Sequence, residues 1–248
     1  MHVIARGAAS GQPLLLLHGV GTGARGWAPQ LDALADTRHV LAPDLPGFGG
    51  SPGPFTLHGA VTQLRAELER RGVECVDVCG LSLGALVALE YTAAWPEQVA
   101  SLTLCAGFAR LPDELRELQA GMVEALAGVP EADFAAVLAD VTRAVPEPFR
   151  ADALADIGGF TPASLAAVMA EASAFDILQP PRFQALHMPV LVLYGEHDAM
   201  NAPLCRNLAN LLLADLERVP DAGHVANLDA PEAFNALLRE FLDKQADV

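Results

Sequence analysis

Residues 80–84 read Gly80-Leu81-Ser82-Leu83-Gly84, and this stretch decides how the rest of the chain is interpreted. A short segment with two valines, 75–79, precedes it, and an Ala- and Leu-rich segment, 85–91, follows it. These patterns predict a buried strand and then a helix. A serine flanked by glycines in a sharp strand-to-helix turn is typical of a nucleophile elbow, because the glycines let strand and helix approach closely. Ser82 is therefore a candidate nucleophile.

The composition indicates one large globular domain, or a domain with an insertion. The chain has 248 residues, of which 52% are hydrophobic, so it can bury a sizeable core. Its net charge of -16 at pH 7 would repel phosphates. We therefore expect neither nucleic acid nor an anionic membrane surface as a partner.

The expected compartment is the cytoplasm. Residues 1–6 lack the apolar core of a signal peptide, and the leucine run 14–17 is too short to span a bilayer. The cysteines show no CxxC pair and no metal-like spacing with histidine. Three of them fall in predicted buried strands, where free thiols behave as small apolar side chains. The four are Cys75, Cys79, Cys105 and Cys205. We expect free thiols, no metal and no cofactor.

Strand and helix patterns alternate through most of the chain. The predicted strands are residues 2–6, 13–18, 39–42, 75–79, 99–105, 189–194 and 216–219. Helices are predicted at 27–35, 57–70, 85–91, 203–212 and 231–241. This alternation calls for an α/β fold, a mostly parallel sheet with helices on both faces.

The alternation is interrupted between residues 108 and 186. Here we predict helices at 112–127, 131–144, 148–157 and 162–173, punctuated by proline and glycine. We therefore expect an α/β core of residues 1–107 and 187–248, with an inserted helical lid of residues 108–186. The alternative is a helical subdomain without a gating role.

A base for Ser82 is expected at the carboxyl end of a strand, where functional groups gather in parallel sheets. His224, in Pro220-Asp221-Ala222-Gly223-His224, follows the last predicted strand and is the best candidate. His18 also follows a strand, and we interpret it as shaping the glycine-rich loop behind it. His197 is a third histidine after a strand end.

The acid is expected to be Asp198, in Gly195-Glu196-His197-Asp198. A carboxylate there would accept the Nδ1 proton of His224, which turns Nε2 toward Ser82. The chain order serine, acid, histidine is typical of this kind of fold. Other acids are available, for which turn or helix capping is the ordinary role. They are Glu196, Asp221 and Asp229.

An oxyanion hole requires two preorganised N–H donors. The N–H of Leu83, directly after the nucleophile, would supply one. The loop His18-Gly19-Val20-Gly21 would supply the other through the N–H of Val20. Three glycines are expected to shape these turns: Gly19, Gly80 and Gly84.

With HGVG at 18–21, DLPGFGGS at 44–51, GLSLG at 80–84, GEHD at 195–198 and DAGH at 221–224, the chain resembles the α/β-hydrolase superfamily. The resemblance covers essentially the whole chain. It implies a catalytic triad of Ser82, Asp198 and His224, with Val20 and Leu83 as oxyanion donors. The family usually opens with an extra antiparallel strand. Too few residues precede Pro13 for a full pair, so we expect a trimmed edge.

The resemblance also indicates which members of the superfamily this chain is most similar to. Haloalkane dehalogenases and epoxide hydrolases carry an aspartate where this chain has Ser82, and carbon–carbon hydrolases typically place tryptophan where Val225 stands. Residues 224–234 most resemble the 3-oxoadipate enol-lactonases and small carboxylesterases. An enol-lactonase must hold a substrate carboxylate, for which the predicted lid offers Arg110, Arg116, Arg143, Arg150 and Arg182.

The expected function is hydrolysis of a small carboxylic ester or lactone through an acyl-enzyme. Phenylalanines of the predicted lid suggest an apolar pocket, although lid–core packing is their more ordinary role. They are Phe134, Phe149, Phe160 and Phe175. Two alternatives keep the same residues: a cofactor-free haloperoxidase or perhydrolase, and a ligand receptor that turns over slowly.

Overall fold

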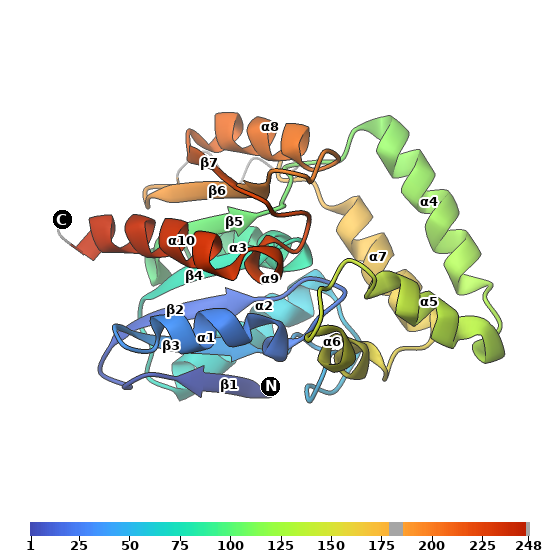
Figure 1. The fold of residues 1–248 in the computed structure, drawn as a ribbon, viewed down its shortest axis with the longest axis horizontal. Coiled ribbons are helices and arrows are strands. Elements are labelled where there is room, and N and C mark those ends of the chain that lie inside the picture. The colour runs from blue at the N-terminus through green and yellow to red at the C-terminus, as the bar shows by residue number, and fades with distance from the viewer. Residues whose placement is uncertain (179–185, 247–248) are drawn as a thin grey trace.

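A seven-stranded sheet forms the centre of the computed structural model, which describes residues 1–178 and 186–246 (Figure 1). The strand order is β1-β3-β2-β4-β5-β6-β7. All neighbouring strands are parallel except β1, which pairs antiparallel with β3. The strands are β1 (Val3–Arg6), β2 (Gln12–Leu17), β3 (Arg38–Pro43), β4 (Val76–Leu81), β5 (Val99–Cys105), β6 (Val190–Gly195) and β7 (Asp215–Val219). The predicted α/β class is confirmed.

Helices cover both faces of this sheet. One face carries η1 (Ala24–Trp27), α1 (Ala28–Leu34), α9 (Ala226–Asp229) and α10 (Pro231–Ala246). The other carries α2 (Leu57–Arg70), α3 (Leu83–Ala94) and α8 (Ala202–Leu212), and a short turn, η2 (Pro96–Gln98), leads into β5. Each face therefore has its own hydrophobic core.

The leucines of β2 explain why that strand shows no polar alternation. Leu14 and Leu16 are buried in the core beneath α1 and α10, whereas Leu15 and Leu17 are buried in the core beneath α2 and α3. Successive side chains of a strand point to opposite faces, so a strand covered on both sides is apolar throughout.

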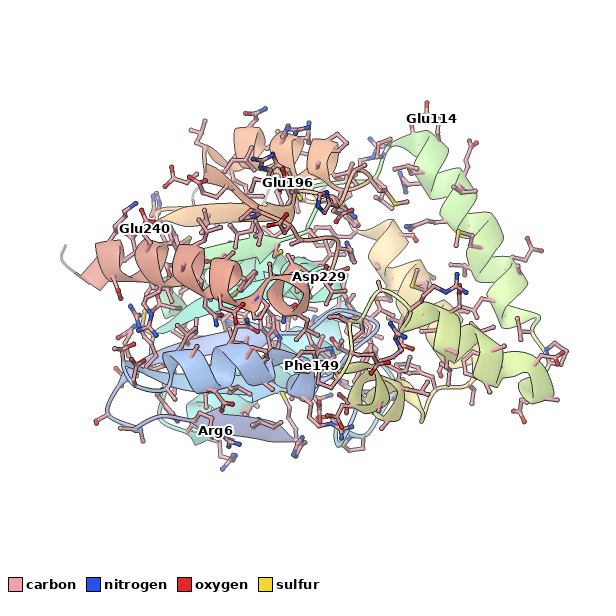
Figure 2. All side chains as sticks on the ribbon, in the orientation of Figure 1. Arg6, Glu114, Phe149, Glu196, Asp229 and Glu240 are labelled. Atoms are coloured by element: carbon pink, nitrogen blue, oxygen red, sulfur yellow. The ribbon has the colours of Figure 1, made fainter. Side chains whose placement is uncertain are left out.

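Between β5 and β6 the chain forms α4 (Asp113–Ala127), η3 (Glu131–Asp133), α5 (Phe134–Val141), α6 (Arg150–Ile157) and α7 (Pro162–Ala174). In Figure 1 these helices lie beyond one end of the sheet, with α4 alongside α7. Phe134, Phe160 and Phe175 are buried in the core, and Phe149, beside α6 in Figure 2, packs against the core on the other face. These four phenylalanines thus pack against the hydrophobic cores, which is the ordinary role considered for them.

An ion-pair cluster fixes α6 to the sheet side of the molecule. Arg25 of η1 donates through Nη1 to Asp152 at 2.7 Å and through Nε to Asp156 at 2.9 Å. The backbone of α6 takes part as well, because the N–H of Gly49 donates to the carbonyl of Asp156 at 2.7 Å. Burial raises the pKa of Asp156, and Arg25 opposes that shift.

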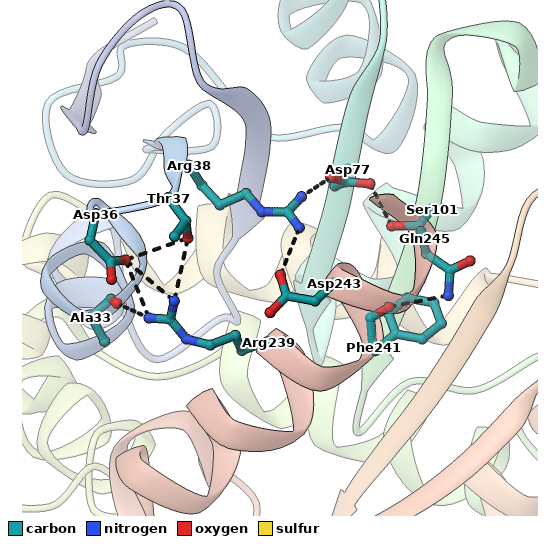
Figure 3. Close-up of polar contacts among 10 residues, drawn as sticks. All are labelled: Ala33, Asp36, Thr37, Arg38, Asp77, Ser101, Arg239, Phe241, Asp243 and Gln245. Atoms are coloured by element: carbon teal, nitrogen blue, oxygen red, sulfur yellow. Dashed lines mark hydrogen bonds and ion pairs between the residues drawn. The ribbon is translucent and has the colours of Figure 1, made fainter. Parts of the chain in front are cut away.

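A second, buried ion pair joins the amino ends of three strands (Figure 3). Arg38 at the start of β3 donates to Asp77 of β4 at 2.7 Å, and Ser101 of β5 donates to the same carboxylate at 2.6 Å. The two charged side chains are only 7% and 4% exposed. Burial raises the pKa of Asp77 above its ordinary value, and the contacts with Ser101 and Arg38 offset only part of that rise.

The cysteines differ from expectation at one position. Cys79, Cys105 and Cys205 are free and buried, but Cys75 is exposed. The prediction that Cys75 is buried was wrong because β4 begins one residue later, at Val76, and Cys75 belongs to the preceding turn.

No single helix in residues 1–178 and 186–246 has both the length and the apolar character needed to cross a bilayer. Among the described helices, α6 and α7 reach that length and apolar character when taken together, and a bend of 100° separates them.

Candidate active site

Ser82 lies in the sharp turn between β4 and α3, with φ at 53°. A residue with a side chain rarely adopts this left-handed region, so the turn stores backbone strain. The N–H of Ser82 donates to Cys105 of β5 at 2.8 Å, which ties the turn to the neighbouring strand. A Cβ at Gly80 would lie 2.3 Å from the Gly84 carbonyl oxygen, and a Cβ at Gly84 would lie 2.0 Å from that of Leu17. Both positions therefore require glycine.

His224 reaches Ser82 from the loop after β7. Its Nε2 lies 3.1 Å from the serine Oγ, within hydrogen-bond distance. The loop is held by Asp229 of α9, labelled in Figure 2, which accepts the N–H of Gly223 at 2.9 Å. Burial raises the pKa of Asp229, and the Gly223 N–H and His224 oppose that rise.

Asp198 lies after β6 and faces the other side of the His224 ring. The side chain is buried, and its Oδ2 is 2.9 Å from Nδ1 of His224. Burial would raise the pKa of Asp198, but hydrogen bonds from His224 and Asn201 outweigh it, so the pKa lies below its ordinary value. An ionised carboxylate only accepts hydrogen bonds, so Nδ1 carries the ring proton and Nε2 presents its lone pair to Ser82.

The glycine-rich loop after β2 lies against Ser82. A Cβ at Gly19 would be 3.3 Å from the Ser82 Cβ and 3.9 Å from its Oγ. Val20 follows directly in this loop. Leu83 is the first residue of α3, where the helix provides no backbone acceptor for its N–H. The two amides expected to form an oxyanion hole thus belong to segments that flank Ser82.

His18 is engaged at both ring nitrogens. Its Nδ1 contacts the Gly19 carbonyl at 2.8 Å, and its Nε2 accepts the N–H of Leu45 at 2.9 Å. Burial lowers the pKa of His18, although Gly19 and Asp44 act in the opposite direction, so the ring is held neutral. It joins the loops after β2 and β3 and presents no free nitrogen to Ser82.

The other candidate acids have different partners. Glu196 accepts from Arg218 at 2.6 Å and from the N–H of Asp221 at 3.1 Å, while Asp229 holds Gly223. Of the sequence candidates, the structure brings Ser82, His224 and Asp198 together in one line of contacts.

Within the described ranges, the group of possible metal ligands near this edge consists of Glu196, His197 and Asp221. Their ligand atoms lie within 4.8 Å of one another, and all three residues are exposed. One of the three, Glu196, forms an ion pair with Arg218 at 2.6 Å.

The arginines nominated for a substrate carboxylate are paired with acids of their own segment. Arg110 contacts Asp113 and Asp176, and Arg116 also contacts Asp113. The remaining described pairs are Arg143 with Asp140 and Arg150 with Glu147. Arg182 lies outside the described residues.

Asn201 was missed by sequence reasoning. It directly precedes α8, and its Nδ2 lies 2.9 Å from Oδ1 of Asp198. Asparagine before a predicted helix reads as a capping residue. The available signal was its position three residues after the candidate acid.

Comparison with known proteins identifies the family of this chain. The alpha/beta hydrolase family matches residues 14–237. A pimeloyl-[acyl-carrier protein] methyl ester esterase from Neisseria meningitidis is 32% identical over 253 residues, covering 92% of each chain. An esterase structure from Thermogutta terrifontis has a TM-score of 0.80 at 26% identity, covering 98% of this chain and 93% of that one. The enol-lactonase of Burkholderia xenovorans LB400 also has a TM-score of 0.80 at 26% identity, with coverage of 98% and 96%.

Proposed function

Because this chain belongs to the alpha/beta hydrolase family, we propose that it is a serine hydrolase that cleaves small carboxylic esters or lactones, with Ser82 as its nucleophile. The observation that carries the proposal is the continuous contact from Ser82 Oγ through the His224 ring to Asp198, at 3.1 Å and 2.9 Å. This arrangement activates a hydroxyl that is unreactive at its ordinary pKa.

In the proposed reaction, Ser82 Oγ attacks the ester carbonyl while His224 Nε2 takes the serine proton. Asp198 stabilises the imidazolium, and the N–H groups of Val20 and Leu83 hold the oxyanion. The intermediate collapses, the alcohol leaves with the proton from His224, and an acyl-enzyme remains. His224 then takes a proton from water, whose oxygen attacks the acyl carbon. The bond between the acyl carbon and Ser82 Oγ breaks, His224 returns the proton to Oγ, and the acid leaves.

An uncharged ester is the preferred substrate class in this proposal. The described arginines between β5 and β6 are each paired with a carboxylate, which leaves a substrate carboxylate in competition with those acids. The Neisseria relative is named as a methyl ester esterase, which favours an ester of a small alcohol. We further propose that residues 108–186 act as a lid over the core of residues 1–107 and 187–248.

Hydrolysis of p-nitrophenyl acetate and butyrate tests the proposal. We expect Ser82→Ala to lower kcat/KM by roughly 10³- to 10⁶-fold. Asp198→Asn is expected to lower it by about 10⁴-fold because the histidine tautomer is no longer held. Glu196→Gln, in the alternative acid, serves as the matched control and should retain the parent rate.

An unchanged rate in Ser82→Ala would remove this serine from the mechanism. Equal losses in Asp198→Asn and Glu196→Gln would mean that the acid is misassigned. Peroxide-dependent halogenation faster than ester cleavage would favour the haloperoxidase alternative.

A further inference from the structure

Asn201 does not use its side chain for the ordinary task of a residue at a helix start. Asparagine there usually accepts a backbone N–H of the first turn. The N-terminus of α8 has no side-chain cap from Asn201. Instead, Nδ2 of Asn201 lies 2.9 Å and 3.0 Å from the two carboxylate oxygens of Asp198, and 3.1 Å from Nδ1 of His224.

We propose that Asn201 is a positioning residue for the Asp198–His224 pair, holding the carboxylate in line with the ring and withdrawing part of its negative charge. This role rests on the function proposed above for Ser82. It adds a fourth side chain, acting through Asp198, to the three that would carry out the chemistry.

The donor set on Asp198 supports this assignment. The carboxylate accepts from Nδ1 of His224, from Nδ2 of Asn201 and from the backbone N–H of Asn201 at 3.3 Å. The opposite amide orientation would turn an oxygen toward two carboxylate oxygens, which electrostatics opposes. Asn201 binds Oδ1 through both its backbone and its side chain, and its Nδ2 also lies 3.0 Å from Oδ2, the oxygen that His224 contacts, so the orientation of the carboxylate is fixed next to the ring.

Asn201 also reduces the negative charge of Asp198 that acts on the His224 ring. Its amide shares the carboxylate with the Nδ1 proton, so the attraction between Asp198 and a protonated ring is weaker than it would be without that second donor. Removing the donor should stabilise the imidazolium and move the acidic limb of activity to higher pH.

The other charged and titratable groups around the pair do not duplicate this effect. Asp229 on α9 acts on His224 through space. Cys105 of β5 and Cys205 of α8 lie near Asp198. Burial raises the pKa of Cys205 to about 12 and the pKa of Cys105 well above its ordinary value, so both thiols are neutral. Among the described residues, the side chains that donate to Asp198 are those of His224 and Asn201.

The first test is the pH profile of kcat/KM for an ester substrate. Asn201→Leu keeps the side-chain shape but removes the donor, and we expect the acidic midpoint to rise by about 0.5–1 pH unit. Asn201→Asp adds a negative charge at the same place and should raise it further. Asn207→Leu, at an exposed asparagine of α8, is the control and should leave the midpoint unchanged. A midpoint that stays fixed in both Asn201 variants, whatever happens to kcat, would overturn the proposal.

The second test does not require turnover. In a Ser82→Ala background, proton NMR follows the His224 ring through a pH titration, with the resonance assigned by its loss in His224→Gln. We expect the titration midpoint to rise on Asn201→Leu, by the same amount as the activity limb. If the titration midpoint rises but the protein with Ser82 intact does not hydrolyse esters, the positioning role of Asn201 holds and the esterase proposal fails. If that protein hydrolyses esters but the titration midpoint does not move, the esterase proposal holds and the positioning role fails.

Discussion

Single positions in the strand-to-helix turn decide whether Ser82 can adopt its conformation between β4 and α3. Ser82 has φ at 53°, a conformation that the surroundings must impose. They do so through the N–H contact to β5 and through the close approach of α3 to β2 at Gly84. The backbone strain at Ser82 is thus offset by packing that only glycine permits.

Gly84→Ala tests this packing. A Cβ there would lie 2.0 Å from the Leu17 carbonyl oxygen, a backbone atom that cannot rotate away. We expect a loss of about 3 kcal/mol or more in the free energy of unfolding, measured with urea.

The matched control is Gly121→Ala, in the middle of α4, where a Cβ would meet nothing within 4 Å. Alanine there should stabilise the protein by about 0.5–1 kcal/mol because it restricts the unfolded chain and favours the helix. Equal free energies of unfolding for the two variants would show that the close approach at Gly84 is not real.

At the scale of single residues, the features with a local cause could be predicted from the sequence. The glycine spacing around Ser82 is a requirement of the turn itself, so it can be read from five residues. Asn201 could not be interpreted this way, because its side-chain direction depends on His224, which is distant in sequence and arrives from another strand. Local propensity indicated a cap, and tertiary contact overrode it.

Among whole elements, the buried Arg38–Asp77 pair connects β3, β4 and β5 at the end of the sheet away from Ser82. Arg38→Met keeps the apolar stem but leaves the Asp77 charge buried without its partner. We expect a loss of about 3–5 kcal/mol in the free energy of unfolding. Arg143→Met, in an exposed pair, should change it by no more than about 0.5 kcal/mol.

The stability lost in Arg38→Met should depend on pH. Burial raises the pKa of Asp77, so the native state binds this proton more readily than the unfolded state. That contribution to stability is complete at low pH and is lost as pH rises through the native pKa. Without Arg38 the pKa of Asp77 in the native state should rise further. The loss of unfolding free energy in Arg38→Met should therefore be smaller at about pH 5 than at about pH 8. A deficit that grows on acidification would contradict this account.

The strands and the longer helices could be predicted from sequence patterns, whereas two four-residue segments, η1 and α9, could not. The seven predicted strands correspond to β1–β7, with ends that differ by at most two residues. The turn η1 and the helix α9 each have four residues, too few for a 3.6-residue period to appear. They position Arg25 and Asp229, so the parts that sequence patterns cannot show include contacts that support the site.

At the scale of the whole molecule, the excess of acidic residues should influence which esters arrive. A net charge of -16 repels anionic substrates over a distance set by the ionic strength. We expect kcat/KM for a carboxylate-bearing ester to rise with added NaCl, relative to an uncharged ester of the same size. A fall with salt would instead indicate a positive local field and an anion-binding site near Ser82.

The central claim is that Ser82 is an activated nucleophile. A p-nitrophenyl phosphonate, which reacts with activated serines, tests it directly when intact mass and peptide mapping locate the adduct. We expect one phosphonyl group per chain on the peptide containing Ser82, much slower labelling in His224→Gln, and none in Ser82→Ala. Labelling at another residue, or equal labelling in the Ser82→Ala protein, would contradict the account.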